Sequence, residues 1–136
     1  MSNTAPEKSE LRAQLRRRRM QLAPEERAAS ARAAARNARN LPTWTASQRI
    51  ALYLPANGEM DTGPLAMDCR AQGKSLYLPV IRDDLSLQFA LWVEDQDLVT
   101  NRFGIPEPGE GSRRIGGGDV DIVLMALVGW DRGGRR

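Results

Sequence analysis

The stretch that most constrains the fold of this chain spans residues 49–62 and reads RIALYLPANGEMDT. Its apolar run, residues 50–54, is short and is closed by Pro55, which is typical of a buried strand rather than of a helix. Residues 56–58 supply a turn, so Glu59 is expected at the rim where the strand gives way to the next element. Because open α/β sheets bind ligands at the carboxyl ends of their strands, Glu59 is a candidate site residue; a solvated loop acid is the alternative.

A helix is expected after this loop, over residues 61–72, with Asp61 and Thr62 as candidate caps. Residues 75–80 then form a second apolar run, and a helix between two apolar strands implies a parallel βαβ crossover. A last buried strand is expected over residues 121–128. This alternation predicts one α/β domain over the whole chain, with three layers and a largely parallel sheet flanked by helices. Its parallel strands are expected near Ile50, Leu76 and Val123.

The sequence predicts less regular structure elsewhere in the second half of the chain. Residues 85–93 show a mixed alternation that favours a third strand with one open face. Residues 95–100 favour a short helical turn. Residues 101–111 contain two prolines and three glycines, which predicts a surface loop rather than a core element. At the other end of the chain, residues 1–6 are polar and are expected to be irregular.

Two helices are expected before the first strand. Residues 7–21 have leucines spaced for one narrow apolar stripe, and residues 24–40 are rich in alanine, with small side chains on one face. The four consecutive arginines, residues 16–19, must fan around the helix axis, so most are expected to be solvated or paired with acids. Lys8 and Arg12 are four residues apart and share a face, where they form a twin cation that suits a polyphosphate; plain surface charge is the alternative. The small face of the second helix comprises Ala28, Ala31, Ala35 and Ala38.

The composition excludes several classes of chemistry. The chain has no histidine, which rules out Ser-His and Cys-His nucleophilic dyads and histidine metal ligands. Cys69 is the single cysteine, so neither an internal disulfide nor a cysteine-based zinc site is possible, and a cytoplasmic location is expected. The sequence has no secretion signal and no apolar run of membrane length, which predicts a soluble, unexported protein. The net charge of +3 is a mild excess that suits anionic ligands.

Five segments stand in a specific order along the chain: KSELR, ALYLPANGEMDT, GKSLYLPVI, NRFGIPEP and DIVLMALVGWDRGGRR. In this order and spacing they resemble the 5-formyltetrahydrofolate cyclo-ligase (methenyltetrahydrofolate synthetase) family, and the match covers nearly the whole chain. The resemblance implies a NagB/RpiA/CoA transferase-like fold. Family members continue after the equivalent of Arg136 into a Gly-rich, Tyr-Asp-containing segment that binds nucleotide phosphates and metal. This chain is therefore expected to be an incomplete copy.

The resemblance also implies roles for individual residues. Lys8 and Arg12 correspond to the ATP-contacting Lys and Arg of the family's K-x-x-L-R pattern, and Arg136 matches the arginine of its F-D-x-x-G-x-R pattern, which is also expected to meet ATP. Leu54 and Glu59 are expected to bind the folate, the first by apolar contact with the pterin and the second by hydrogen bonding. No catalytic residue and no metal ligand is assigned, because the family's magnesium-binding aspartates lie beyond position 136.

Three further residues fall in family motifs. Phe103 and Glu107 belong to a segment similar to the family's F-G-I-x-E-P, which helps to wall the substrate cleft. Asp131 stands in the loop that leads to the nucleotide segment. The resemblance implies that the first two are possible substrate contacts.

The activity implied by the resemblance is an ATP- and Mg²⁺-dependent ligation in folate one-carbon metabolism, which converts 5-formyltetrahydrofolate to 5,10-methenyltetrahydrofolate. The expected partners are a reduced folate and ATP, with no nucleic acid and no membrane, and the protein is expected to be a monomer. Without the family's Gly-rich segment, the 136-residue form is expected to have no measurable turnover. Two alternatives stay open: a basic module that binds nucleic acid or an acidic partner through its Arg-rich helices, and a folded but inactive remnant.

Overall fold

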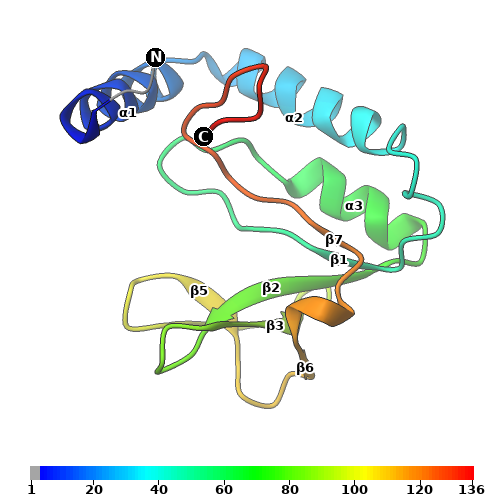
Figure 1. The fold of residues 1–136 in the computed structure, drawn as a ribbon. Coiled ribbons are helices and arrows are strands. Elements are labelled where there is room, and N and C mark those ends of the chain that lie inside the picture. Colours follow the sequence, from blue (N-terminus) through cyan, green and yellow to red (C-terminus); the bar gives the residue numbers. More distant parts are fainter. Residues whose placement is uncertain (1–3) are drawn as a thin grey trace.

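The computed structural model describes residues 4–136, which form three α-helices, seven short strands and one 3-10 turn (Figure 1). In chain order these are α1 (Ala5–Met20), α2 (Pro24–Ala38), β1 (Arg49–Ala51), α3 (Gly63–Ala71), β2 (Ser75–Ile81), β3 (Leu87–Leu91), β4 (Leu98–Thr100), β5 (Pro106–Pro108), β6 (Arg114–Ile115), η1 (Gly117–Asp119) and β7 (Ile122–Val123). Within this described part of the chain, no helix combines the length and the apolar character that a membrane crossing requires.

The larger sheet has five strands in the order β6-β3-β2-β1-β7, and β4 pairs with β5 in a separate sheet. Strand β1 runs parallel to both β2 and β7, with Ile50 beside Leu76 and Ile122, so the parallel crossover through α3 is confirmed. The pairings of β2 with β3 and of β3 with β6 are antiparallel, so the sheet is mixed and the prediction of a largely parallel sheet is wrong. The cause is a tight turn in which the Arg82 N–H donates to the Ser86 carbonyl oxygen at 2.9 Å and sends β3 back along β2.

The described residues form two layers, where three were predicted. Helices α2 and α3 lie on one face of the large sheet (Figure 1), and the main core fills the space between them and the strands. The opposite face carries a smaller apolar cluster, against which Figure 1 shows no helix other than the short η1. The main core includes Ala35, Ala38, Ile50, Leu52, Leu65, Cys69, Leu76 and Leu78, and the smaller cluster comprises Ala51, Tyr77, Phe89 and Ile115.

Local hydrogen bonds and small side chains explain the two N-terminal helices. The Thr4 hydroxyl accepts the Glu7 N–H at 3.4 Å while the Glu7 carboxylate accepts the Thr4 N–H at 2.7 Å, a reciprocal cap that starts α1 at Ala5. The prediction of irregular structure over residues 1–6 is therefore wrong from Ala5 onward, and residues 1–3 lie outside the described part. In α2 the predicted small face is buried at Ala31, Ala35 and Ala38, whereas Ala28 is exposed.

A hairpin of β4 and β5 replaces the helical turn predicted over residues 95–100 and part of the loop predicted over residues 101–111. The loop prediction is wrong here because prolines are compatible with a short edge strand, where a missing N–H costs no ladder bond. The helical-turn prediction is wrong because Leu98–Thr100 are extended and pair with β5. Pro106 and Pro108 flank Glu107 in β5, and Pro108 is fully buried.

Strand β7 lies at the edge of the large sheet, so the buried strand predicted over residues 121–128 is wrong in extent and burial. Only Ile122 and Val123 pair with β1. The Asp121 carboxylate anchors the start of β7. It accepts the backbone N–H groups of Arg49 at 2.9 Å and of Gln48 at 2.8 Å. Beyond this point alternate apolar side chains face solvent, with exposed fractions of 45% for Val123, 61% for Met125 and 42% for Leu127.

Lys74 is buried at the start of β2 although it carries a charge. Its ammonium donates to the Trp44 carbonyl oxygen at 2.8 Å and to the Ser47 carbonyl oxygen, and it lies 4.9 Å from the centre of the Trp44 ring. The lysine therefore joins β2 to the turns that follow α2, in the part of the core that contains Trp44.

Candidate functional site

The loop between β1 and α3 is held by its own hydrogen bonds. The Tyr53 hydroxyl donates to the Met60 carbonyl oxygen at 2.9 Å, and the Thr62 hydroxyl donates to the Tyr53 carbonyl oxygen at 2.7 Å. Thr62 directly precedes α3, as predicted. Its side chain does not cap the helix, because its hydroxyl bonds to Tyr53 instead. The Glu59 carboxylate accepts the Ala56 N–H at 2.9 Å, which closes the turn between them. The predicted turn and the placement of Glu59 after the strand are confirmed.

The pKa of Tyr53 reflects the burial and the charges around this loop. Burial raises the pKa of its phenol above the ordinary value, and the negative charge of Glu59 raises that pKa further, while Arg19 acts in the opposite direction. The hydroxyl therefore stays protonated near neutral pH and keeps its donor role toward Met60. The Glu59 carboxylate and the Arg19 guanidinium are both near enough to influence the same phenol.

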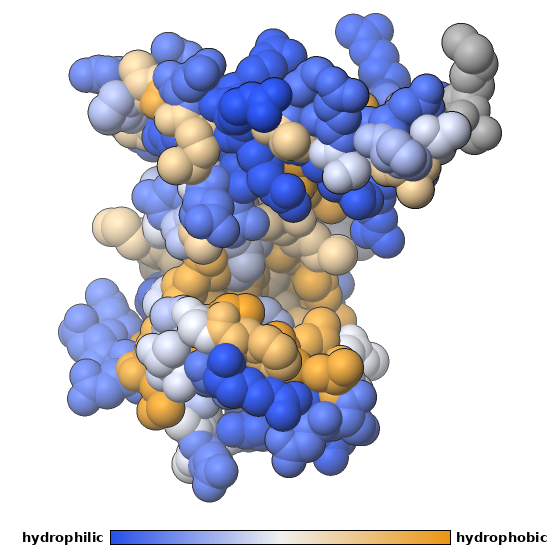
Figure 2. Space-filling model, turned by 90° about the vertical axis from the view of Figure 1, so that its left-hand side faces the viewer, coloured by the Kyte–Doolittle hydropathy of each residue, from blue (hydrophilic) through white to orange (hydrophobic). Residues whose placement is uncertain are grey.

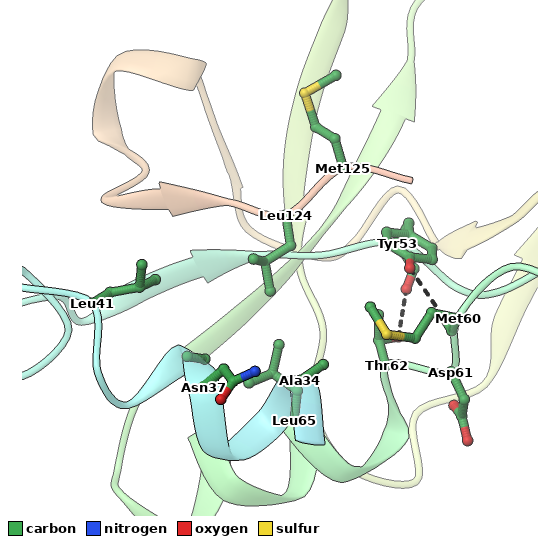
Figure 3. Close-up of a pocket in the computed structure, with 11 residues that line it drawn as sticks. Ala34, Asn37, Leu41, Tyr53, Met60, Asp61, Thr62, Leu65, Leu124 and Met125 are labelled. Atoms are coloured by element: carbon green, nitrogen blue, oxygen red, sulfur yellow. Dashed lines mark hydrogen bonds between the residues drawn. The ribbon is translucent and has the colours of Figure 1, made fainter. Parts of the chain in front are cut away.

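A cavity of about 370 Å³ lies beside this loop, between α2, the start of α3 and the segment after β7 (Figure 3). This volume is in the range of small-molecule sites. Tyr53 and Met60 line it, whereas the two predicted folate residues do not: Leu54 is half-buried against the main core, and Glu59 bonds to its own turn. The remaining lining residues are Ala34, Asn37, Ala38, Leu41, Asp61, Thr62, Leu65, Leu124 and Met125.

The second half of α1 packs against this loop and against the segment after β7. The Arg19 guanidinium donates to the Asn57 carbonyl oxygen at 3.1 Å. Gly58 has a φ of +76°, and a Cβ there would lie 2.7 Å from the Met20 sulfur, so glycine is favoured at this close approach. A Cβ on Gly129 would likewise collide with the Leu15 side chain. Helix α1 is therefore in contact with the segments that follow the carboxyl ends of β1 and β7.

Lys8 and Arg12 are exposed and lie on the side of α1 that makes these contacts. At 3.6 residues per turn, Lys8, Arg12, Leu15 and Arg19 fall within a sector of about 60°. Leu15 meets the segment after β7, and Arg19 meets the loop. At about 1.5 Å per residue, Arg12 stands about 4.5 Å and Lys8 about 10 Å along the axis from Leu15. We call this row the cation face of α1. Figure 2 shows one face of the molecule, on which the upper part is predominantly hydrophilic.

The last residues form a compact turn around Asp131. Its carboxylate accepts the backbone N–H groups of Gly133 and Arg135 at 2.8 and 3.0 Å and pairs with the Arg135 guanidinium at 2.7 Å. The hydrogen bond from the Arg135 backbone is the main reason that the pKa of Asp131 is lowered. Arg136 follows this turn and is exposed. Trp130, which directly precedes Asp131, is 73% exposed.

The F-G-I-x-E-P segment lies in the β4–β5 hairpin. Phe103 is 51% exposed, and the Arg102 guanidinium lies 4.9 Å from the centre of its ring. The Glu107 carboxylate accepts the Asn101 side-chain N–H at 3.1 Å. Their roles as substrate contacts stay predictions.

Sequence reasoning missed three residues that shape the site. Arg19 was grouped with the solvated arginines, and Tyr53 and Arg27 were given no role. All three donate to backbone carbonyl oxygens. Such contacts leave no pattern of side-chain types in the sequence; the glycine at position 58, which lets Met20 approach, is the one signal that pointed to close packing there.

Residues 4–136 match the 5-formyltetrahydrofolate cyclo-ligase family. The chain is 31% identical over 125 residues to the 5-formyltetrahydrofolate cyclo-ligase of Escherichia coli strain K12, an alignment that covers 90% of this chain and 69% of that protein. It is 28% identical over 132 residues to the Haemophilus influenzae 5-formyltetrahydrofolate cyclo-ligase, covering 95% of this chain and 71% of that protein.

Solved structures agree with this assignment. The NMR structure of 5,10-methenyltetrahydrofolate synthetase from Aquifex aeolicus superposes with a TM-score of 0.78 at 33% identity, over 91% of this chain and 62% of that chain. A 5,10-methenyltetrahydrofolate synthetase from Mycoplasma pneumoniae gives 0.68 at 18% identity, over 92% of this chain and 66% of that chain, which supports the fold alone.

The chain belongs to the 5-formyltetrahydrofolate cyclo-ligase family, and the predicted resemblance is confirmed. It spans about two thirds of the length of the relatives that it matches.

Proposed function

We propose that this chain binds ATP and a reduced folate as part of an enzyme that converts 5-formyltetrahydrofolate to 5,10-methenyltetrahydrofolate. Membership of the family supports the reaction class. The observation that carries the proposal is the cation face of α1: the row that holds Lys8 and Arg12 continues into Leu15 and Arg19, which contact the two segments at the carboxyl end of the sheet. That is the edge at which α/β sheets bind ligands.

The reaction needs a strong phosphoryl donor, because a formyl oxygen leaves poorly as hydroxide. ATP transfers its γ-phosphate to the N5-formyl oxygen and ADP departs. N10 then attacks the activated carbon, the carbon–oxygen bond breaks, phosphate leaves and the methenyl ring is closed. In such transfers the protein mainly positions the reactants and stabilises charge. Lys8, Arg12 and Arg136 would meet the phosphates, and Leu54 and Glu59 would meet the folate.

The family's requirement for magnesium has no counterpart among the described residues. Residues 4–136 contain no group of three or more acidic, cysteine or histidine side chains placed to hold a metal ion. We assign no metal ligand to these residues.

Binding is the direct test. Calorimetry with a non-hydrolysable ATP analogue and with 5-formyltetrahydrofolate should detect both ligands. Arg12→Met should weaken nucleotide binding about tenfold or more, because a charge-assisted hydrogen bond contributes about 1.5–3 kcal/mol. Glu59→Gln should weaken folate binding without affecting the nucleotide.

Arg17→Met is the matched control for Arg12→Met. Arg17 is exposed and stands about 180° around the helix from Lys8, so its loss should leave nucleotide affinity unchanged. Equal losses in both variants, with a steep salt dependence and comparable binding of random oligonucleotides, would instead favour a general polyanion-binding module.

Turnover is a separate measurement, followed by the absorbance of methenyltetrahydrofolate after ATP and magnesium are added. Loss of one stabilising donor costs about 100-fold or more in such reactions, and the family places several donors after position 136. We therefore expect residues 1–136 to bind without measurable turnover. Robust turnover would mean that these residues build the phosphate site by themselves.

A further inference from the structure

Arg27, in the first turns of α2, connects three separate parts of the chain. Its Nε donates to the Leu22 carbonyl oxygen at 3.2 Å, one terminal nitrogen donates to the Gly58 carbonyl oxygen at 3.0 Å, and the other donates to the Arg19 carbonyl oxygen. The side chain is half-buried, and all three acceptors are backbone groups. We call this arrangement the Arg27 clamp.

The clamp acts on the end of α1. The carbonyl oxygens of Arg19 and Leu22 lie at the carboxyl end of that helix, where the peptide dipoles leave partial negative charge, and among the described residues the only backbone donor to the Arg19 oxygen beyond the cap is the Leu22 N–H at 3.4 Å. A guanidinium placed there satisfies the acceptors and complements the dipole. Because α1 has no buried residue of its own, its direction depends on a few such contacts at its end.

The clamp also acts on the loop that presents Glu59. Gly58 directly precedes Glu59, and its carbonyl oxygen is held by Arg27 while the neighbouring Asn57 carbonyl oxygen is held by Arg19. An added Cβ on Gly58 would approach the Arg27 nitrogens to 3.1 and 3.2 Å. One planar guanidinium therefore fixes the distance between the end of α1 and the turn before Glu59.

We propose that Arg27 is a positioning residue that couples the nucleotide and folate sites, by holding the cation face of α1 against the loop that carries Glu59. This inference rests on the proposed function, because it assigns ATP to that face and folate to that loop. A ligand that binds more tightly when α1 and the loop are clamped together raises the population of that arrangement, and so tightens binding of the other ligand, which is positive coupling. Lysine cannot replace the arginine, because an ammonium is a point donor without the planar fork that reaches three acceptors.

The test compares wild type with Arg27→Gln and Arg27→Lys, using calorimetry of 5-formyltetrahydrofolate with and without a saturating non-hydrolysable ATP analogue. In wild type the analogue should tighten folate binding at least about fivefold, the lower end of typical allosteric coupling. Both variants should lose most of that enhancement while each ligand alone binds within about threefold of wild type, a change well below the range attributed to a lost charge-assisted contact. Arg32→Gln, an exposed position on the same helix, is the control and should keep the enhancement.

Hydrogen exchange supplies an independent readout in the same proteins. Amides of residues 56–60 and of the last turn of α1 should exchange faster in the Arg27 variants and at the wild-type rate in Arg32→Gln. If wild type binds neither ligand, the proposed function fails, and unchanged exchange in the Arg27 variants would then overturn the clamp as well. If wild type binds both ligands but shows no enhancement, or the Arg27 variants keep it, the inference is overturned while the proposed function stands. If Arg27→Gln does not fold, the Arg27→Lys variant is used alone. The clamp is then refuted if the ATP analogue tightens folate binding to Arg27→Lys as much as it does to wild type.

Discussion

Replacing Gly58 by alanine should destabilise the domain through two separable costs. The residue has a φ of +76°, and an L side chain in this left-handed region costs about 1–2 kcal/mol. Its new Cβ would also lie 2.7 Å from the Met20 sulfur. Met20 is 58% exposed and can rotate partly away, so this contact should add about 1 kcal/mol, the lower end of overpacking costs. The expected loss in the free energy of unfolding is about 2–3 kcal/mol.

Gly73→Ala isolates the first cost. Gly73 also has a φ of +76°, but a Cβ there would meet nothing within 4 Å, so this variant should lose only about 1–2 kcal/mol. Urea unfolding followed by circular dichroism gives both values from midpoints and slopes. Adding Met20→Ala should remove most of the extra cost from Gly58→Ala, with a remainder from the Arg27 nitrogens 3.1 and 3.2 Å from the new Cβ, and should change the wild type little. The reasoning is refuted if the two glycine variants lose equal stability, or if truncating Met20 fails to rescue Gly58→Ala.

Three further perturbations test other parts of the domain. Lys74→Met should cost about 1–3 kcal/mol, as measured by urea unfolding, because the Ser47 carbonyl oxygen loses its lysine donor, while the Trp44 carbonyl oxygen keeps the Ser47 N–H at 3.1 Å. Lys8→Met on exposed α1 should be neutral. Burial raises the pKa of the Cys69 thiol to about 11 and leaves it unexposed, so a thiol reagent should modify the folded protein far more slowly than the urea-unfolded protein; equal rates in the two states would contradict this. The pKa of Asp121 is lowered mainly by the Arg49 N–H, so its stabilisation is present above the ordinary carboxyl pKa and is lost as the pH falls through the lowered value. Asp121→Asn should therefore lower the urea midpoint at neutral pH and flatten its decline in acid, and an unchanged acid decline would count against the anchor.

The sequence predicted the centre of the fold because local signals there agree with one another. The apolar run at Ile50, the turn before Glu59 and the helix after it are each encoded in a few adjacent residues, and their order requires a parallel crossover. The direction of β3 was missed because it depends on the turn near Ser86, whose residues are compatible with several connections. The β4–β5 hairpin was missed because the sequence rule against proline applies to central strands, and Pro106 stands in an edge strand.

The candidate site was predictable only where charge and spacing carry the signal. Lys8 and Arg12 stand four residues apart, which places them on one face of any helix. Contacts of Leu15 and Arg19 with segments far away in the sequence determine where that face points in the folded protein, and spacing alone does not reveal them. Arg27 was out of reach for the same reason, since its three acceptors are backbone oxygens that every residue possesses.

Trp130 gives the protein an optical probe at the place where α1 meets the end of the chain. It is 73% exposed and follows Gly129, which contacts Leu15, whereas Trp44 is 3% exposed within the core. Acrylamide should quench the emission of Trp130 readily and that of Trp44 hardly at all. A ligand on the cation face would shield the first and leave the second unchanged, so fluorescence in Trp130→Phe beside wild type can follow occupancy at this end of α1 without any label.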